Sequence, residues 1–307
     1  MITIFTTAKP FVGQMRINQI NAITSWKQLG PDIEVLLFGK GEGYSEVAKD
    51  LGLVWIDQVG VSANGTPLIT CMFELARQKG HYPTQLYVNC DIILLGNVPE
   101  ILRGINKERF LAVGQRWDID LDKEIEFSNS NWKKLLQSRV LKSATLHPPL
   151  GSDYFLYQGN IWTDLPTLVV GRAGYDNYLI YHCRLKGVPV IDLTETLIAI
   201  HQNHDYRHHP GGYQGVFYGP EAEINSQGLD QTFFFTPVEA DFRIIAGKMR
   251  RNYCRGNLFN YMRSWHFINQ KTGRLPLITK GISIYLWIHH VAGSLRNKFI
   301  KRNEKYG

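Results

Sequence analysis

The first 95 residues alternate between apolar runs that suit strands and segments with helical spacing, and this alternation constrains the fold more than any other feature. The strand-like runs are "MITIFTT", "IEVLLFG", "LVWID" and "QLYVNCDIILL". Between them lie "QMRINQINAITSWKQLG", "YSEVAKDLG" and "PLITCMFELARQKG", each closed by a glycine. Continuously apolar strands separated by helices are typical of a parallel sheet covered on both faces. The sequence therefore predicts an α/β fold with a mostly parallel central sheet flanked by helices.

The rest of the chain continues this pattern with shorter strands. A further strand is predicted in "RFLAVGQRWDID", followed by a polar stretch that is helical around "NWKKLLQSRVL", a helix from Asp176 to Leu185, and a strand in "VPVIDLT". With 307 residues and 44% apolar content the chain can bury a large core. We divide it into a sheet-forming domain, residues 1–242, with halves 1–118 and 119–242, and a C-terminal extension, residues 243–307.

Ligands of such sheets bind where the parallel strands end. The polar tips predicted at that edge are Thr6 to Pro10, Gly39 to Gly43, Asp57, and Asn89 to Asp91. The tip "GKGEG" lacks both the GK[ST] of a phosphate-binding loop and the GxGxxG order of a dinucleotide site. Neither of those two sequence fingerprints is therefore present, although the predicted sheet is Rossmann-like.

Asn89-Cys90-Asp91 places a carboxylate in an apolar strand, where its burial is costly. Alternation along a strand would point Asn89 and Asp91 to the same face, so that two oxygen ligands converge on one hard cation. The alternative is that both side chains cap the strand end and bond nearby backbone groups.

Five segments, in this order, resemble the GT-A glycosyltransferases, the bacterial nucleotide-diphospho-sugar transferases: "IFTTAKPF", "LYVNCDIILL", "GSDYF", "GRAGYDNYL" and "HQNHDY". The resemblance covers roughly residues 1 to 210. It implies transfer of a sugar from a nucleotide-diphosphate-sugar donor, UDP-linked by default, to a saccharide or lipid-linked acceptor. It also implies Mn²⁺ or Mg²⁺ as cofactor, and makes residues 1–118 the nucleotide-sugar half and residues 119–242 the acceptor half.

The metal ligands follow from the same resemblance. Asp91 matches the strand-end position that ligates the metal in this family, whereas Asn89 replaces the usual first aspartate and offers a neutral carbonyl or a bond to ribose. A further ligand is expected from His204 or His201 in the histidine-rich loop. A zinc site in that loop is the less favoured alternative, because no recognised ligand spacing is present.

Two acids are candidates for the general base. Asp176 follows two glycines near a helix start, so it is either the base that the family motif implies or a helix N-cap. Asp153 in "GSDYF" is the second candidate, as a base or as a ligand of the acceptor hydroxyl, and its alternative is a turn-forming residue.

The remaining donor contacts are expected at strand ends. By resemblance, Thr6, Thr7 and Lys9 lie where the nucleotide base and ribose bind. Asp57 is expected to bond the base, and Arg116 to face the donor from the end of a later strand.

The C-terminal extension carries the positive charge. It holds fourteen Lys and Arg against one acid, Glu304, so it contributes +13 to a net +7 and residues 1–242 carry −6. An apolar stripe, Ile284, Ile288, Val291, Leu295 and Phe299, predicts a basic amphipathic helix that contacts an anionic membrane surface. Packing of this helix on the core is the alternative, and nucleic acid is not expected as a partner.

No signal peptide or spanning run is recognised, so we expect a cytoplasmic protein, or one peripheral on the inner face of the membrane. Two other functions remain open. A binding module that kept the fold and lost turnover would explain Asn89. A sugar-nucleotide pyrophosphorylase would need a glycine-rich basic loop after the first strand, which "TTAKPFVGQMR" lacks.

Overall fold

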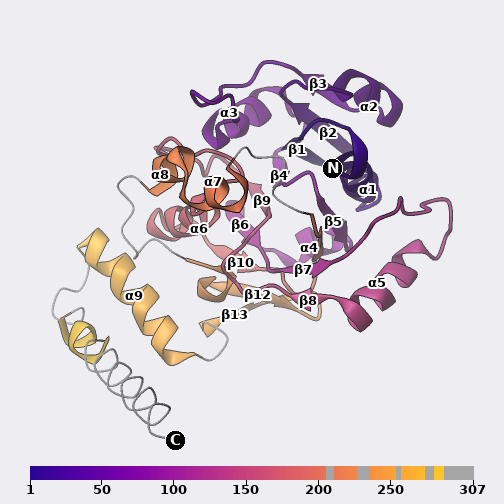
Figure 1. The fold of residues 1–307 in the computed structure, drawn as a ribbon. Coiled ribbons are helices and arrows are strands. Elements are labelled where there is room, and N and C mark those ends of the chain that lie inside the picture. Colours follow the sequence, from indigo (N-terminus) through magenta and orange to yellow (C-terminus); the bar gives the residue numbers. More distant parts are fainter. Residues whose placement is uncertain (205–210, 227–234, 254–256, 274–279, 287–307) are drawn as a thin grey trace, which may run out of the picture.

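The chain folds around a large mixed sheet with a smaller sheet beside it (Figure 1). The computed structural model describes residues 1–204, 211–226, 235–253, 257–273 and 280–286. Within them the large sheet has nine strands in the order β13-β12-β10-β6-β9-β4-β1-β2-β3, and the small one has four in the order β5-β11-β7-β8.

The predicted alternation at the N-terminus is confirmed. It forms β1 (Ile2–Thr7), α1 (Gly13–Trp26), β2 (Ile33–Phe38), α2 (Tyr44–Leu51), β3 (Val54–Ile56), α3 (Ile69–Lys79) and β4 (Thr84–Val88). β1 pairs in parallel with both β2 and β4, and β2 pairs in parallel with β3. These strands end at one edge of the sheet, as the sequence predicts.

Both faces of this sheet are buried, which explains the continuously apolar strands. Ile4 and Leu86 pack beneath α1 in one core cluster, whereas the neighbouring Phe5 and Tyr87 pack beneath α3 and α6 (Tyr175–Leu185) in another. Adjacent residues of one strand therefore both need apolar side chains.

The single strand predicted for "QLYVNCDIILL" is wrong. The chain forms β4, turns at residues 89–91, and continues as β5 (Ile92–Leu95) in the small sheet. Contact with β9 continues as far as Asn89, whose amide donates to the carbonyl of Asp153, and the amide of Ile92 then donates back to the carbonyl of Asn89 at 3.1 Å, which closes the turn. Asn89 and Asp91 therefore do not share a strand face.

"RFLAVGQRWDID" is likewise two strands, β6 (Phe110–Val113) in the large sheet and β7 (Arg116–Ile119) in the small one. Gly114 lies at the change of sheet, where a Cβ atom would come within 2.2 Å of the Tyr154 hydroxyl. A larger residue would displace this buried tyrosine, so the glycine lets the chain pass from one sheet to the other.

The small sheet continues from the carboxyl ends of β4 and β6 and brings distant residues together. β11 (Ile198–Gln202) lies between β5, antiparallel, and β7, parallel. In this register His201 lies opposite Ile92 on one side and Asp118 on the other. A histidine far along the chain is thereby placed next to the turn that carries Asp91.

The other elements complete the two sheets and cover them. They are α4 (Val98–Gly104), α5 (Trp132–Ser143), β8 (Thr145–Leu146), β9 (Tyr154–Gln158), β10 (Val190–Asp192), α7 (Gly212–Tyr218), α8 (Pro220–Ser226), a 3₁₀ turn (Pro237–Glu239), β12 (Phe242–Ile245), β13 (Lys248–Arg251) and α9 (Leu258–Thr272). β9 runs antiparallel between β4 and β6, so the large sheet is mixed.

The C-terminal region begins as part of the large sheet. β12 pairs with β10 and β13 pairs with β12, so the boundary predicted after residue 242 falls within β12 and the sheet extends to Arg251. α9 then lies against α6 and the 3₁₀ turn. Of the five residues of the predicted apolar stripe, only Ile284 belongs to the part of the chain that the structure describes. Its side chain is 60% exposed. The amphipathic helix therefore remains a prediction.

Among the residues that the structure describes, no helix is long and apolar enough to cross a membrane.

Candidate active site

One carboxylate and two imidazoles meet at the end of β4. Asp91 lies in the turn after β4, His201 in β11, and His204 two residues after β11 ends. The Nε2 atoms of His204 and His201 lie 2.9 and 3.9 Å from Oδ2 of Asp91. One ligand atom from each residue lies within 4.8 Å of the other two, which is the separation a shared metal ion requires.

The charge state of Asp91 suits a metal ligand. Burial alone would raise the pKa of its carboxyl, but the hydrogen bond to His204 and the charges of His201 and Lys9 lower the pKa well below its usual range. Asp91 is therefore ionised at neutral pH, as metal ligation requires. An ionised oxygen ligand with two imidazole nitrogens fits a divalent transition metal.

Asp118 orients His201 toward this site. The Nδ1 atom of His201 lies 3.2 Å from Oδ1 of Asp118. A proton held on Nδ1 by this carboxylate leaves the lone pair of Nε2 for a metal, the usual arrangement behind a ligating histidine. Asp118 was not predicted as a site residue, although its position at the end of "RWDID" was a signal for it.

A chain of ion pairs leads from Asp118 to Asp153. The Nε and Nη1 atoms of Arg116 lie 3.0 Å from Asp118 and 2.6 Å from Asp153. On the other side, Nδ1 of His147 lies 2.6 Å from Asp118. Burial would lower the pKa of Arg116, but the Asp153 and Asp118 charges raise it above its usual range. Arg116 thus links Asp118, behind His201, to Asp153. His147 was not predicted from the sequence.

The Asn89 amide faces Asp153 and two tyrosines. Its Nδ2 donates to Oδ1 of Asp153 at 2.7 Å, and its Oδ1 accepts from the hydroxyls of Tyr87 at 2.7 Å and Tyr175 at 3.3 Å. The reasoning that paired Asn89 with Asp91 on one strand face is wrong, because the strand ends at Val88. A metal-ligand role for Asn89 stays a prediction, and its present contacts hold Asp153 and α6 near the end of β4.

Asp176 is the better placed of the two candidate bases. The N-cap of α6 is Gly174, whose φ of 92° suits glycine, so Asp176 lies in the first turn and is not the cap. Its carboxylate is 7% exposed and accepts the backbone N–H of Ser152 at 2.9 Å. Burial raises the pKa of Asp176 to about 6, with the nearby charge of Asp153 adding to the effect.

Asp153 is also buried, 8% exposed, but both of its oxygens are occupied. One accepts from Asn89 and the other from Arg116. Both oxygens of Asp153 are thus already engaged by neighbouring side chains. It is better suited to hold Arg116 and Asn89 in place.

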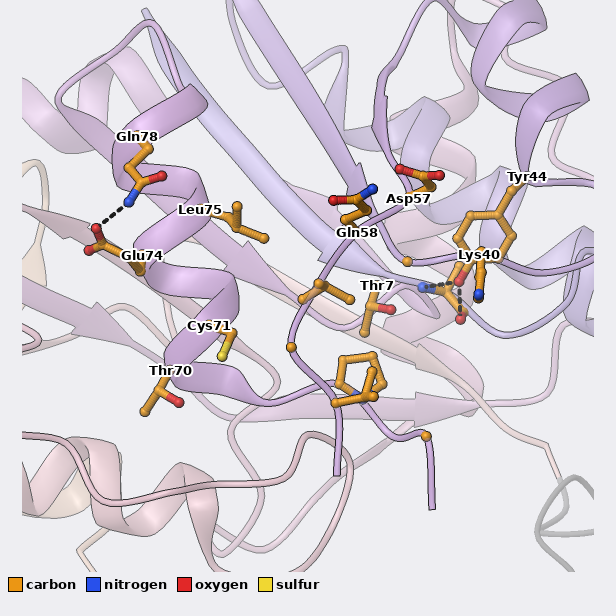
Figure 2. Close-up of a pocket in the computed structure, with 17 residues that line it drawn as sticks. Thr7, Lys40, Tyr44, Asp57, Gln58, Thr70, Cys71, Glu74, Leu75 and Gln78 are labelled. Atoms are coloured by element: carbon orange, nitrogen blue, oxygen red, sulfur yellow. Dashed lines mark hydrogen bonds between the residues drawn. The ribbon is translucent and has the colours of Figure 1, made fainter. Parts of the chain in front are cut away.

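A cavity of about 880 Å³ opens at the carboxyl ends of β1 to β3 (Figure 2). Thr7, Lys40, Tyr44 and Asp57 lie on one side of it, and α3 side chains such as Thr70, Cys71 and Glu74 lie on the other. The structure thus brings Thr7 and Asp57 to one cavity together with Lys40, which belongs to the predicted tip from Gly39 to Gly43.

Thr6 does not line this cavity. It is fully buried, and its hydroxyl donates to the carbonyl of Val88 at 2.6 Å, which ties β1 to the end of β4. Ala8 lines the cavity, and the next residue, Lys9, acts on the Asp91 carboxylate. The end of β1 thus contributes both to the cavity and to the charge around Asp91.

No known family model matches this chain, and no curated protein matches it. Solved structures share part of its architecture. One, described only as a mycobacterial protein, is 15% identical with a TM-score of 0.40, covering 66% of this chain and 68% of that one. Another is glucosyl-3-phosphoglycerate synthase from Mycobacterium tuberculosis with Mg²⁺ and uridine diphosphate, 14% identical with a TM-score of 0.39 over 66% and 72% of the two chains. Likeness at this level assigns no activity to the chain.

Proposed function

We propose that this protein is a divalent-metal-assisted glycosyltransferase that uses a nucleotide-diphosphate-sugar donor. The observation that carries the proposal is the trio of Asp91, His201 and His204 at the end of β4, beside a cavity of about 880 Å³ large enough for a nucleoside. Sites at the carboxyl ends of parallel strands are where such ligands bind. Each of the five segments that resemble the GT-A glycosyltransferases contributes a residue described above, namely Lys9, Asp91, Asp153, Asp176 and His201.

In this proposal the cavity holds the nucleoside, with Thr7, Lys40 and Asp57 as its polar contacts. Asp91, His201 and His204 would hold the metal, which neutralises the negative charge of the leaving nucleoside diphosphate. Lys9 adds a positive charge on the same side. UDP is the default nucleotide, as the resemblance implies.

Asp176 would remove the proton of the acceptor hydroxyl as it attacks the sugar. A pKa of about 6 leaves this carboxylate ionised at pH 7 while keeping it basic enough to accept a proton. Asp153, Arg116 and Asn89 would hold the surrounding groups in position. The acceptor is a saccharide or a lipid-linked sugar in this proposal.

The test is release of nucleoside diphosphate from a panel of nucleotide sugars, with Mn²⁺ or Mg²⁺ and with chelator. We expect turnover with at least one donor, increased by its acceptor and abolished by chelation. A protein that neither binds nor turns over any nucleotide sugar in the presence of metal would refute the proposal.

The contacts of Asn89 support one alternative function, that of a nucleotide- or carbohydrate-binding module. Its amide is bonded to Asp153 and two tyrosines rather than to the trio, so one carboxylate alone supplies charge to the metal. Tight binding of a nucleotide sugar without release of the diphosphate, with or without acceptor, would favour this alternative.

We expect Mn²⁺ to bind about tenfold more tightly than Mg²⁺. Two of the three ligands are imidazoles, and Mg²⁺ prefers oxygen whereas Mn²⁺ accepts nitrogen more readily. Calorimetric titration of metal-free protein with each ion measures the two affinities, and His204→Ala should reduce the ratio between them. Equal affinity for the two ions would show that the histidines are not ligands.

Contact of the C-terminal segment with an anionic membrane surface is also proposed, from its charge of +13. We expect the protein to sediment with vesicles rich in anionic lipid, and the bound fraction to fall when salt rises from about 0.1 to about 0.5 M, because added salt screens the attraction. A chain ending at Gly273 is the control. Absence of binding at low salt would leave packing on the core as the explanation.

A further inference from the structure

The buried side chain of Glu221, on α8, joins two segments that are far apart in the sequence. Its carboxylate is 4% exposed and accepts from the hydroxyl of Thr66 at 2.9 Å and from that of Ser62. It also accepts from Nε and Nη2 of Arg172 at 2.9 and 2.6 Å. One buried acid therefore holds donors from the loop after β3 and from the loop before α6.

Asn225, one turn further along α8, holds the second of these loops through its backbone. Its Oδ1 accepts the N–H of Val169 at 2.7 Å, and its Nδ2 donates to the carbonyls of Val169 at 3.0 Å and Arg172 at 3.3 Å. The two loops also touch directly, since Leu68 bridges to Val169 and the N–H of Val170 donates to Pro67 at 3.1 Å. In Figure 1, α8 lies beside α6 at this junction.

The first loop is a wall of the cavity. Gly60, Val61, Gly65 and Pro67 line it. Residues 62–66 form a compact turn in which Ser62 accepts the N–H groups of Asn64 and Thr66 through its hydroxyl, both at 3.2 Å. The turn is thus closed by its own hydrogen bonds and attached to α8 through its bonds to Glu221.

The second loop leads into the helix that carries the candidate base. Arg172 precedes the N-cap, Gly174, by two residues, and Asp176 follows in the first turn. Tyr175, between them, reaches back to Asn89 at the end of β4. Arg172 and Asp176 are therefore four residues apart, one just before the start of α6 and the other in its first turn.

We propose that Glu221 and Arg172 are positioning residues. Their buried ion pair fixes the wall of the nucleotide cavity relative to the start of α6, so that both donor binding and the position of Asp176 depend on it. This rests on the proposed function, in which the cavity binds the nucleotide and Asp176 serves the acceptor. A buried acid with four donors is held firmly, because each lost bond leaves a desolvated partner.

The two attachments can be cut separately. Ser62→Ala with Thr66→Val removes the hydroxyl bonds from the cavity wall to Glu221 and the 3.3 Å bond from Arg172 to Thr66, and leaves the Glu221–Arg172 pair intact, whereas Glu221→Gln weakens both attachments. We expect the double variant to weaken binding of uridine diphosphate, measured by calorimetry with Mn²⁺, by about tenfold and to raise the donor KM with kcat within twofold of wild type. We expect Glu221→Gln to lower kcat as well.

Thr84→Val is the matched control, because it removes a comparable buried hydrogen bond, to Gln158 at 2.8 Å, at the opposite end of β4. Hydrogen exchange without nucleotide adds a readout that does not depend on activity. It should rise only in residues 60–67 for the double variant, and in both 60–67 and 169–172 for Glu221→Gln.

Nucleotide affinity within twofold of wild type in the double variant would overturn the proposal. Equal losses of affinity in Thr84→Val would also overturn it, since they would reflect general destabilisation. If the wild-type protein binds no nucleoside diphosphate with metal present, the proposed function itself fails, which is a different result from unchanged binding in the variant.

Discussion

Asp91→Ala is expected to lower glycosyl transfer by about 10³-fold, which corresponds to about 4 kcal/mol of lost transition-state stabilisation. Asp91 is the one carboxylate of the trio proposed to hold the metal, so its loss would leave two imidazoles to hold a divalent ion. The measurement is the initial rate of nucleoside diphosphate release at saturating donor and Mn²⁺, together with calorimetric titration of Mn²⁺.

Asp50→Ala is the control for Asp91, because Asp50 is an exposed acid on α2 away from the site. It should leave both the rate and Mn²⁺ affinity unchanged. Asp91→Ala with near-normal transfer would place the metal elsewhere and remove the main support for the proposed function. Loss of transfer with unchanged Mn²⁺ affinity would assign Asp91 another role.

Asp176→Asn is expected to lower kcat by about 10²- to 10⁴-fold, the usual contribution of a positioned general base. In the wild-type protein kcat should rise with pH through about 6, because the pKa of Asp176 is raised to about 6 by burial and by Asp153. The variant should lack this rise. The test is a pH–rate profile of both proteins at saturating donor and acceptor, with Asp153→Asn for comparison.

Near-normal kcat in Asp176→Asn, with a large loss of kcat in Asp153→Asn, would show that Asp153 and not Asp176 is the general base. If both variants keep near-normal kcat, neither acid is the base. An unchanged pH dependence in Asp176→Asn would show that the rise belongs to another group.

The same pKa has a consequence for stability that does not depend on catalysis. The folded-state pKa of Asp176 is raised from 3.8 to about 6, so the folded protein binds this proton more tightly than the unfolded chain. The free energy of unfolding therefore falls as pH rises from about 4 to above 6, by roughly 3 kcal/mol. The Asn side chain of the Asp176→Asn variant does not titrate, so the free energy of unfolding of this variant should lack this decrease.

Urea unfolding at pH 4 and at pH 7 measures this difference. The stability of Asp176→Asn relative to wild type should increase by roughly 3 kcal/mol between the two pH values. A constant difference would show that Asp176 titrates alike in the folded and unfolded chain, and would weaken its assignment as a base with raised pKa.

The parallel half of the fold was predictable because both of its faces are buried. Ile4 and Phe5 lie on opposite faces of β1 and both meet helices, so the strand must be apolar at consecutive positions. Such runs stand out between segments with helical spacing. The short strands after residue 88 were not separated correctly, because β4 and β5 form one continuous apolar run interrupted only by residues 89–91.

In the candidate site, Asp91 was predicted from its place at a strand end and from the resemblance, whereas His201 and His204 were predicted from the resemblance alone. Asp91, His201 and His204 were predicted as ligands and lie together. The pairing of Asn89 with Asp91 failed because it assumed strand geometry where the chain turns. Asp118 and His147 were missed, since their partners come from other strands and loops of the small sheet.

The sequence by itself determined the elements whose signal is local: the alternating strands and helices, and the polar residues that end the strands. Only the tertiary structure decided which of these residues meet. His201 reaches Asp118 and Asp91 because β11 inserts between β5 and β7 in one register, and Glu221 joins two loops more than 100 residues apart. Such contacts depend on how sheets and loops pack across the whole chain, and no local pattern carries that information.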